Sequence, residues 1–261
     1  MYFYIYDSFL QEKKYKRAVS KIETRLANLN ISGSKRRLTV LKSVEEIVRS
    51  LSRNDSPTVV VIGGDETFCR AATAMAGTNG VLGFIPVRKE SEIAKVLGLP
   101  IDEFACDVVS ARRLETLKFG DINGKKFLSS VSFDAHKATL TADDKYKIIP
   151  KKTKKIKVAN LDLLRFNKTE EDDDFKRQAS NPKDDYLEIL MGSPGSKFLF
   201  FERKQRLDSL FFVEKLEIKP KKSKHDVKIT IDKGEKTVSA PATVTISDES
   251  LPIIVGKERL I

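Results

Sequence analysis

The chain has 261 residues, of which 40% are hydrophobic and 33% charged, and its formal net charge is +11. This composition is typical of a soluble globular protein with one large or two modest domains. The longest apolar runs, such as residues 59–62, fall far short of the roughly 18 residues that a membrane-spanning helix needs. Two cysteines are too few for a disulfide framework.

The first ten residues are apolar and aromatic, but they have no basic leader and include Asp7. They predict a first strand rather than a signal peptide. Cys69 is expected at the start of a helix and Cys106 in an apolar strand, both as buried, reduced thiols. We therefore expect a cytoplasmic protein, with a peripheral position at the inner membrane face as an alternative.

Strand-like and helix-like segments alternate over the first hundred residues. We expect strands at residues 3–6, 38–41, 58–62 and 81–85, and helices at 15–29, 44–51, 68–75 and 91–97. Such alternation predicts a doubly wound α/β domain, with a mostly parallel sheet and helices on both faces. Ligands of these sheets bind beyond the carboxyl ends of the strands.

After about residue 107 the pattern changes to short strand-like runs separated by turn signals. The runs lie at residues 114–119, 126–133, 156–166, 186–191, 197–201, 209–219, 227–231 and 243–246. They predict an antiparallel β-sandwich, with residues 169–184 as a flexible charged loop. The expected domains are an α/β nucleotide-binding-like domain at 1–107 and a β-sandwich domain, of a substrate- or lipid-binding kind, at 108–246.

Lysines gather in two stretches of the second half: Lys145, Lys147, Lys151, Lys152, Lys154, Lys155 and Lys157, and then Lys215, Lys219, Lys221, Lys222 and Lys224. An anionic membrane attracts such clusters by about 1 kcal/mol per residue near its surface. A lipid substrate or an anionic membrane is therefore one expected partner, and a plain solvated surface is the alternative. Nucleic acid is disfavoured, because few aromatic residues lie between the charges. The sequence is compatible with a homodimer but does not encode the oligomeric state.

The most informative segment is the β-branched run at residues 59–62, which leads into Gly63, Gly64, Asp65, Glu66 and Thr67. A strand, a glycine turn and a helix bring backbone N–H groups up to a phosphate. Glu66 is unexpected there, because its carboxylate repels a phosphate. Two roles are open for Asp65: it is part of a nucleotide site, or it is the N-cap of the following helix.

These residues, together with later ones, resemble the diacylglycerol kinase catalytic family, which shares its fold with sphingosine kinases and, more distantly, NAD kinases. The family's G-G-D-G-T corresponds to residues 63–67, and its I-P-x-G-T-x-N-D-F-A-R-x-L-G-I-P aligns without a gap with residues 85–100. Residues 117–128 look like the strand–turn–strand that opens the family's β domain. The family's D-G-E aligns near residues 232–235. By the same analogy, residues 247–261 return to the first domain.

The departures from the family pattern fall on the chemistry. The family's asparagine-proline-glycine loop after the first strand is replaced by Asp7-Ser8-Phe9. The fourth residue of the glycine motif is Glu66. The glycine-threonine pair of the second motif is Arg88-Lys89, and its asparagine is Ser91. Together they suggest a kinase scaffold whose catalysis is lost or altered.

The resemblance implies an ATP- and Mg-dependent lipid kinase, in which a phosphoryl group passes to a lipid hydroxyl. Its nucleotide site would comprise Gly63, Gly64, Asp65, Glu66, Thr67, Arg88, Lys89 and Ser91. Asp232, or Glu235, would act as the general base, and Asp208 would be a metal ligand. Arg88 and Lys89 have an alternative, in which they pair with Glu66 and Glu90 and close the site. The alternative function is a catalytically inactive pseudokinase that binds a lipid, a membrane or a protein.

Overall fold

The computed structural model describes residues 1–39, 42–51, 56–150, 155–164, 178–193, 197–198, 201–202, 206–223, 226–234 and 236–261. The chain forms two compact units. One comprises Met1–Lys118 with Glu249–Ile261, and the other comprises Phe119–Asp248. Among the described residues, no helix is both long enough and apolar enough to span a membrane.

The sheet of the first unit is parallel and has the strand order β2-β1-β3-β4. These strands are β1 (Tyr2–Tyr6), β2 (Ser34–Arg37), β3 (Thr58–Gly63) and β4 (Val81–Pro86). Every residue of β3 and β4 is buried, which is what continuous apolar runs produce in a parallel sheet covered on both faces. The end of β20 (Ala242–Ile254) pairs in parallel with β4 through Ile253 and Leu82.

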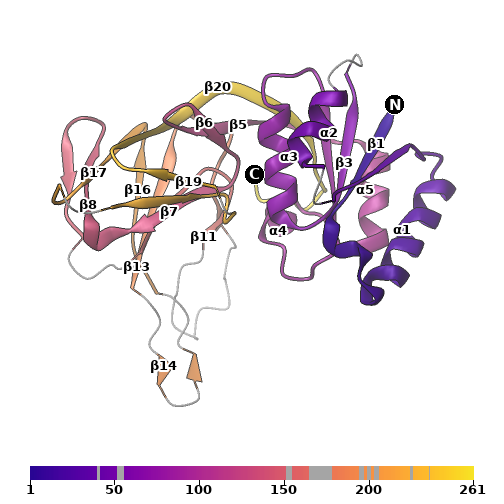
Figure 1. Cartoon of the computed structure of the whole chain (residues 1–261), viewed down its shortest axis with the longest axis horizontal. Helices are drawn as coiled ribbons and strands as arrows, with labels where there is room; N and C mark the ends of the chain where they lie inside the picture. The colour runs from indigo at the N-terminus through magenta and orange to yellow at the C-terminus, as the bar shows by residue number, and fades with distance from the viewer. Residues whose placement is uncertain are drawn as a thin grey trace. The chain divides into compact units, whose positions relative to one another are not determined.

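Helices cover this sheet on both sides (Figure 1). The amphipathic helix α1 (Lys16–Asn28) and helix α5 (Ala105–Ala111) bury Ile22, Leu26 and Val109 in one core cluster with Tyr4, Tyr6 and Val60. Helices α2 (Val44–Leu51) and α3 (Asp65–Met75) pack against each other. The short helix α4 (Glu92–Val96) follows β4. Because the strands are parallel, β1 and β3 end at the same edge of the sheet.

The second unit consists of antiparallel strands around a core of its own. One sheet has the order β16-β13-β10-β7-β18-β19, and in the other β20, β17, β8 and β9 are neighbours. The strands of the first are β7 (Ser130–Asp134), β10 (Lys155–Ala159), β13 (Leu187–Ser193), β16 (Arg206–Val213), β18 (Lys228–Ile231) and β19 (Thr237–Ser239). Apolar side chains of both sheets, such as Val131 and Leu216, share one core cluster.

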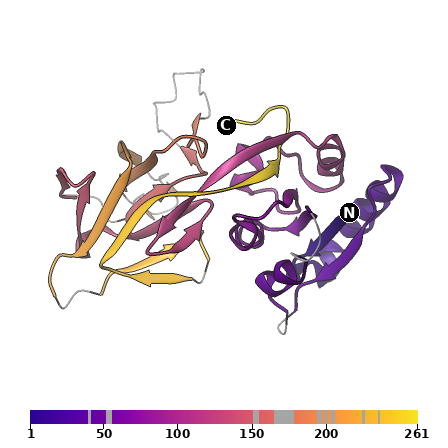
Figure 2. The same cartoon turned by 90° about the horizontal axis from the view of Figure 1, so that it is seen from above.

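The other strands of this part of the chain include β5 (Leu114–Ile122), β6 (Lys125–Phe127), β8 (Ala138–Ala142), β9 (Tyr146–Ile148) and β17 (Lys215–Pro220). The long strand β20, yellow in Figure 2, runs beside β5. The short strands β11 (Leu163–Leu164) and β12 (Gln178–Ala179) pair with each other, as do β14 (Lys197–Phe198) and β15 (Phe201–Glu202).

The expected fold class, α/β followed by antiparallel β, is confirmed, but several elements differ from their predictions. The second strand is Ser34–Arg37 rather than residues 38–41. Cys106 lies in helix α5 and not in a strand, and burial raises the pKa of its thiol. Of the expected loop at 169–184, residues 169–177 lie outside the described part of the chain, and Gln178–Ala179 form β12.

Candidate functional site

The glycine turn lies where β3 ends and α3 begins. Gly63 closes the strand, Gly64 has extended backbone and is the N-cap of α3, and Thr67 is buried in the first turn of the helix. An ideal Cβ built at Gly63 would lie 2.4 Å from the Cβ of Asp7, so a larger residue does not fit there. The parallel order of β1 and β3 brings Asp7, the residue after β1, against this turn.

The carboxylate of Asp7 occupies the donors of the turn. Its Oδ2 accepts hydrogen bonds from the Gly64 backbone N–H at 3.2 Å and from the Thr67 hydroxyl at 2.6 Å. Asp7 is buried, and its own N–H donates to Ile62 O at 2.9 Å. A negative group is favourable at this position, because the N-terminus of a helix carries partial positive charge. The chain therefore supplies its own anion at the place where a phosphate would be expected.

The aromatic ring of Phe9 covers the same turn. Phe9 belongs to the short 3-10 helix Ser8–Gln11 after β1, and an ideal Cβ at Gly64 would lie 3.7 Å from its Cε1 atom. The guanidinium of Arg88 lies over this ring, 4.2 Å from the ring centroid. This is the distance of a cation–π interaction. Arg88 thus contacts the segment that closes the turn.

Asp65 and Ser91 lie close together, and both form hydrogen bonds at the start of helix α4. Asp65 accepts hydrogen bonds from the Ser91 hydroxyl and from the backbone N–H groups of Glu92, at 3.0 Å, and Ile93, at 3.3 Å. Ser91 is the N-cap of α4, and its Oγ accepts from the Ala94 N–H at 2.9 Å. The expectation that Asp65 caps the helix that follows it is therefore wrong. Its carboxylate satisfies the first turn of α4 instead.

Glu66, Arg88, Lys89 and Glu90 are all exposed. Within the described ranges, no ion pair joins either cation to Glu66 or Glu90, so the expected pairing does not form. The next helical turn of α3 carries Arg70, which binds both carboxylate oxygens of Glu45 on α2, at 3.2 and 2.8 Å. The hydrogen bonds that Arg70 donates to Glu45 raise the pKa of Arg70, and the charges of Glu66 and Asp7 act in the same direction.

In the second unit the carboxylate of Asp232 accepts backbone hydrogen bonds, as that of Asp7 does in the first unit. Its carboxylate accepts hydrogen bonds from three consecutive backbone N–H groups, those of Leu128 at 3.1 Å, Ser129 at 2.7 Å and Ser130 at 3.1 Å. Burial raises the pKa of Asp232 to about 6, while these donors act to lower it. The side chain is buried and its oxygens are engaged, so this geometry supports a structural role and not an exposed general base.

Asn160 binds the backbone carbonyl oxygens of the same segment, residues 128–130. Its Nδ2 donates to Leu128 O at 2.9 Å, and its backbone N–H donates to Ser129 O at 2.8 Å. The connection between β6 and β7 is thereby bonded to both Asp232 and Asn160. Two side chains, separated widely in sequence, fix one short stretch of backbone.

The sequence prediction did not include Glu188, a buried carboxyl in β13 with an exposed fraction of 2%. It accepts a hydrogen bond from the Asn181 N–H at 3.2 Å, and its Oε2 has no hydrogen-bond partner among the described residues. Burial raises the pKa of Glu188 to about 7, and the negative charges of Asp184 and Asp162 also raise it. Its ionised form is thus unfavourable in the folded protein.

This raised pKa predicts that protonation of Glu188 stabilises the folded state. Between the unfolded pKa of about 4.3 and the folded pKa of about 7, the folded state binds a proton that the unfolded state lacks, so stability falls as pH rises. We expect Glu188 to contribute a loss of about 3 kcal/mol between pH 4 and pH 8. Urea unfolding across this range should show a flatter profile for Glu188→Gln than for the exposed control Glu214→Gln. Identical profiles for these two variants would contradict the assignment.

Two of the expected site residues cannot be placed. Glu235 lies outside the described residues, and so does the side chain of Asp208, whose backbone belongs to β16. Where the structure describes side chains, no group of three or more His, Cys, Asp or Glu residues could hold a metal ion.

Comparison with known proteins agrees with this architecture. The model of the diacylglycerol kinase catalytic domain matches residues 2–122. A solved structure of a diacylglycerol kinase from Bacillus anthracis str. Sterne is 13% identical, with a TM-score of 0.71 over 98% of this chain and 97% of that one. Two further structures from the same organism, with the same enzyme name in their descriptions, are 12% and 13% identical and have TM-scores of 0.72 and 0.73 at the same coverage.

No curated protein sequence matches the chain. At 12–13% identity the solved structures establish the fold alone, and the domain match covers residues 2–122. The fold is the two-part architecture of these solved structures, and the residues that the domain model matches include the whole of β1, β3, α3 and the glycine turn. Residues 2–122 of this chain thus match the diacylglycerol kinase catalytic domain, and the whole chain has the fold of the solved structures named above.

Proposed function

We propose that this chain is a lipid-kinase-like protein in which ATP-dependent phosphoryl transfer to a lipid hydroxyl is strongly impaired. The observation that carries the proposal is the position of Asp7, whose carboxylate accepts the hydrogen bonds of Gly64 and Thr67. Those two groups are the donors that a strand–glycine–helix turn offers to a phosphate. A nucleotide would have to displace Asp7 before it reached them.

The residues at this turn do not fit Mg-ATP. A phosphate charge 4 Å from a carboxylate is repelled by about 1 kcal/mol in water and by about 4 kcal/mol near a protein surface. Here Asp7 and Glu66 both flank the turn, Phe9 covers it, and Arg88 is packed on Phe9. Arrangement and charge therefore both oppose nucleotide binding.

A thermal-melting titration tests this proposal. A ligand that binds only the folded state stabilises it by about 2.7 kcal/mol when its concentration is 100 times its Kd. We expect millimolar Mg-ATP, ADP and NAD to leave the melting temperature unchanged, and a transfer assay with diacylglycerol in mixed micelles to show no product above the no-enzyme rate. A clear shift with Mg-ATP, accompanied by phosphorylated lipid, would overturn the proposal.

A second function, membrane binding without catalysis, is favoured by the β8–β9 hairpin. Tyr146 and Ile149 are 67% and 61% exposed, and the exposed Lys145 and Lys147 flank Tyr146. Among the described residues neither of these lysines has an ion-pair partner. Exposed aromatic and aliphatic side chains beside lysines suit the interface of an anionic membrane. Lys151, Lys152 and Lys154 of the same stretch lie outside the described residues.

Liposome sedimentation separates this candidate from a merely solvated surface. We expect vesicles with anionic lipid to bind the protein, neutral vesicles not to, and high salt to weaken the binding, because surface charges are screened. Replacing both Tyr146 and Ile149 by serine should reduce binding, whereas the control Tyr186→Ser, another exposed aromatic, should not. Binding that ignores salt and the double substitution would refute the candidate.

A further inference from the structure

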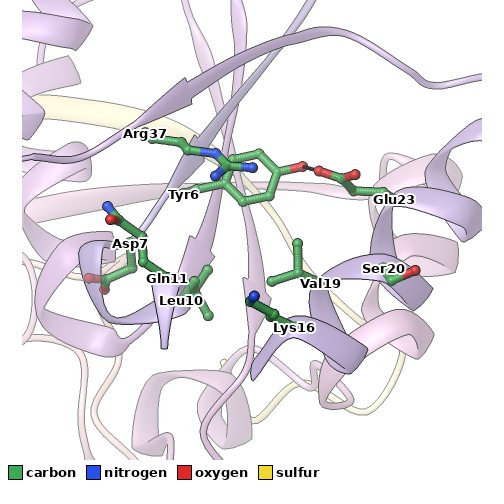
Figure 3. A pocket seen from close by; sticks show the side chains of 9 residues that line it. All are labelled: Tyr6, Asp7, Leu10, Gln11, Lys16, Val19, Ser20, Glu23 and Arg37. Atoms are coloured by element: carbon green, nitrogen blue, oxygen red, sulfur yellow. Dashed lines mark hydrogen bonds between the residues drawn. The ribbon is translucent and has the colours of Figure 1, made fainter. Parts of the chain in front are cut away.

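The first unit contains a cavity that is separate from the donors of the glycine turn. Its volume is about 290 Å³, and it lies between α1 and the carboxyl ends of β1 and β2 (Figure 3). This is near the lower end of the range for small-molecule sites. Asp7 forms part of its wall, but the Asp7 carboxylate is already bonded to Gly64 and Thr67. The cavity therefore has a lining chemistry of its own.

One part of the cavity wall is apolar. The Tyr6 ring, Leu10 from the segment after β1 and Val19 from α1 all line it. Tyr6 and Leu10 are buried members of the core cluster, and Val19 packs against that cluster. The packing of the unit holds these side chains in place, so this part of the cavity wall is formed without a ligand. They suit a compact apolar body, such as an aromatic ring.

The one further acid of the cavity, Glu23, is neutralised. It accepts a hydrogen bond from the Tyr6 hydroxyl at 3.0 Å and forms an ion pair with Lys35 at 2.9 Å. Burial raises its pKa, but the hydrogen bonds from Lys35 and Tyr6 outweigh this and hold the pKa below its ordinary value. Glu23 is therefore ionised and already partnered by Lys35 and Tyr6, and the positive charge of Arg37 also acts to lower its pKa.

Two cations, Lys16 and Arg37, also line the cavity. Lys16 begins α1, and Arg37 ends β2 and lies over the Tyr6 ring at 6.0 Å from its centroid. Across the described residues neither cation has an ion-pair partner. A guanidinium and an ammonium that line a partly apolar cavity can bind an anionic group through charge-assisted hydrogen bonds.

We propose that this cavity binds a small organic anion, with its apolar body against Tyr6, Leu10 and Val19 and its anionic group between Lys16 and Arg37. The anionic group is a carboxylate or a phosphate monoester, since both fit these cations. The proposal is independent of the proposed impairment of the kinase site, because it uses neither Gly64 nor Thr67.

Calorimetric titration with three matched probes tests it. Benzoate and phenyl phosphate carry the two anionic groups on the same ring, and benzyl alcohol is the neutral analogue. We expect at least one of the two anions to bind and benzyl alcohol to bind at least tenfold more weakly. Arg37→Gln and Lys16→Gln should each weaken anion binding roughly tenfold. Arg36→Gln is the control, because Arg36 is the neighbouring exposed cation of β2 and does not line the cavity.

A variant that fills the cavity without changing charge provides a second check. Val19→Phe should abolish anion binding while circular dichroism shows that the helix content is kept. Benzoate against phenyl phosphate then identifies the preferred anion. The proposal is overturned if neither anion binds at concentrations up to about 10 mM. It is also overturned if benzyl alcohol binds as tightly as the anions, or if Arg36→Gln weakens binding as much as Arg37→Gln.

Discussion

Replacing Asp7 with alanine is expected to lower the free energy of unfolding by about 2–4 kcal/mol. The substitution leaves the Gly64 N–H and the Thr67 hydroxyl without the carboxylate that accepts their hydrogen bonds. A buried polar group that loses its partner costs about 1–3 kcal/mol. The partial positive charge at the start of α3 also loses its counter-charge. Urea unfolding of the variant and the wild type measures the difference.

The same variant should respond to inorganic phosphate. Phosphate can occupy the vacated donors, so we expect it to restore part of the lost stability of Asp7→Ala and to leave the wild type unchanged. Asp143→Ala is a matched control, because Asp143 also accepts two backbone N–H bonds, from Glu214 and Lys215, each at 3.0 Å, but in an exposed turn. Equal phosphate responses in the two variants would show that the effect is not specific to the glycine turn.

The substitution Asp232→Ala is expected to cost about 3 kcal/mol or more at pH 8. Three consecutive buried N–H groups, from Leu128 to Ser130, lose their acceptor at once. The total stability of a domain is about 5–15 kcal/mol, so the loss is a large fraction of it. Work at pH 8 keeps the wild-type carboxylate ionised, since its pKa is about 6. Urea unfolding followed by circular dichroism gives the value.

Two comparisons make this test specific. Asp226 is exposed and lies just before β18, the strand that Asp232 follows. Asp226→Ala should therefore change the free energy of unfolding by no more than about 0.5 kcal/mol. Asp232→Asn keeps one acceptor oxygen in the same shape and should lie between alanine and the wild type. If Asp232→Ala is as stable as Asp226→Ala, the three hydrogen bonds do not hold the β6–β7 connection.

Elements with a strong hydrophobic period were predicted well. The helix expected at residues 44–51 has these bounds in the structure, because its apolar residues recur at helical spacing on one buried face. The second strand was placed wrongly for the converse reason. Ser34–Arg37 is polar and mostly exposed at the edge of the sheet, so no apolar pattern marks it. Helix α5, where an apolar strand was expected at Cys106, contains two adjacent valines, and β-branched residues are enriched in strands.

The candidate site was predicted only in part. The glycine turn could be identified because its strand, glycines and helix are contiguous in the sequence. The Asp7 carboxylate could not, since it reaches Gly64 across 57 residues and Thr67 across 60. One signal was available. In a parallel sheet the residue after β1 lies at the same edge as the residue after β3, so an acid at position 7 could have been tested against the turn.

The contacts of Asp65 also could not be predicted, because they join residues far apart in the sequence. The sequence shows an acid at the start of a helix, which is typical of an N-cap, but its carboxylate caps α4, 27 residues away from its own position. Local pattern identifies the residue type that a cap needs and not which helix it serves. Tertiary packing decides that, and it also placed Arg88 over Phe9 rather than beside Glu66.

A crystal soaked in millimolar Mg-ATP tests the occupation of the glycine turn most directly. We predict that the Asp7 carboxylate stays within hydrogen-bond distance of Gly64 N and Thr67 Oγ1, that Phe9 keeps its place, and that no triphosphate density appears there. A triphosphate bound to Gly64 and Thr67, with Asp7 displaced, would contradict the account.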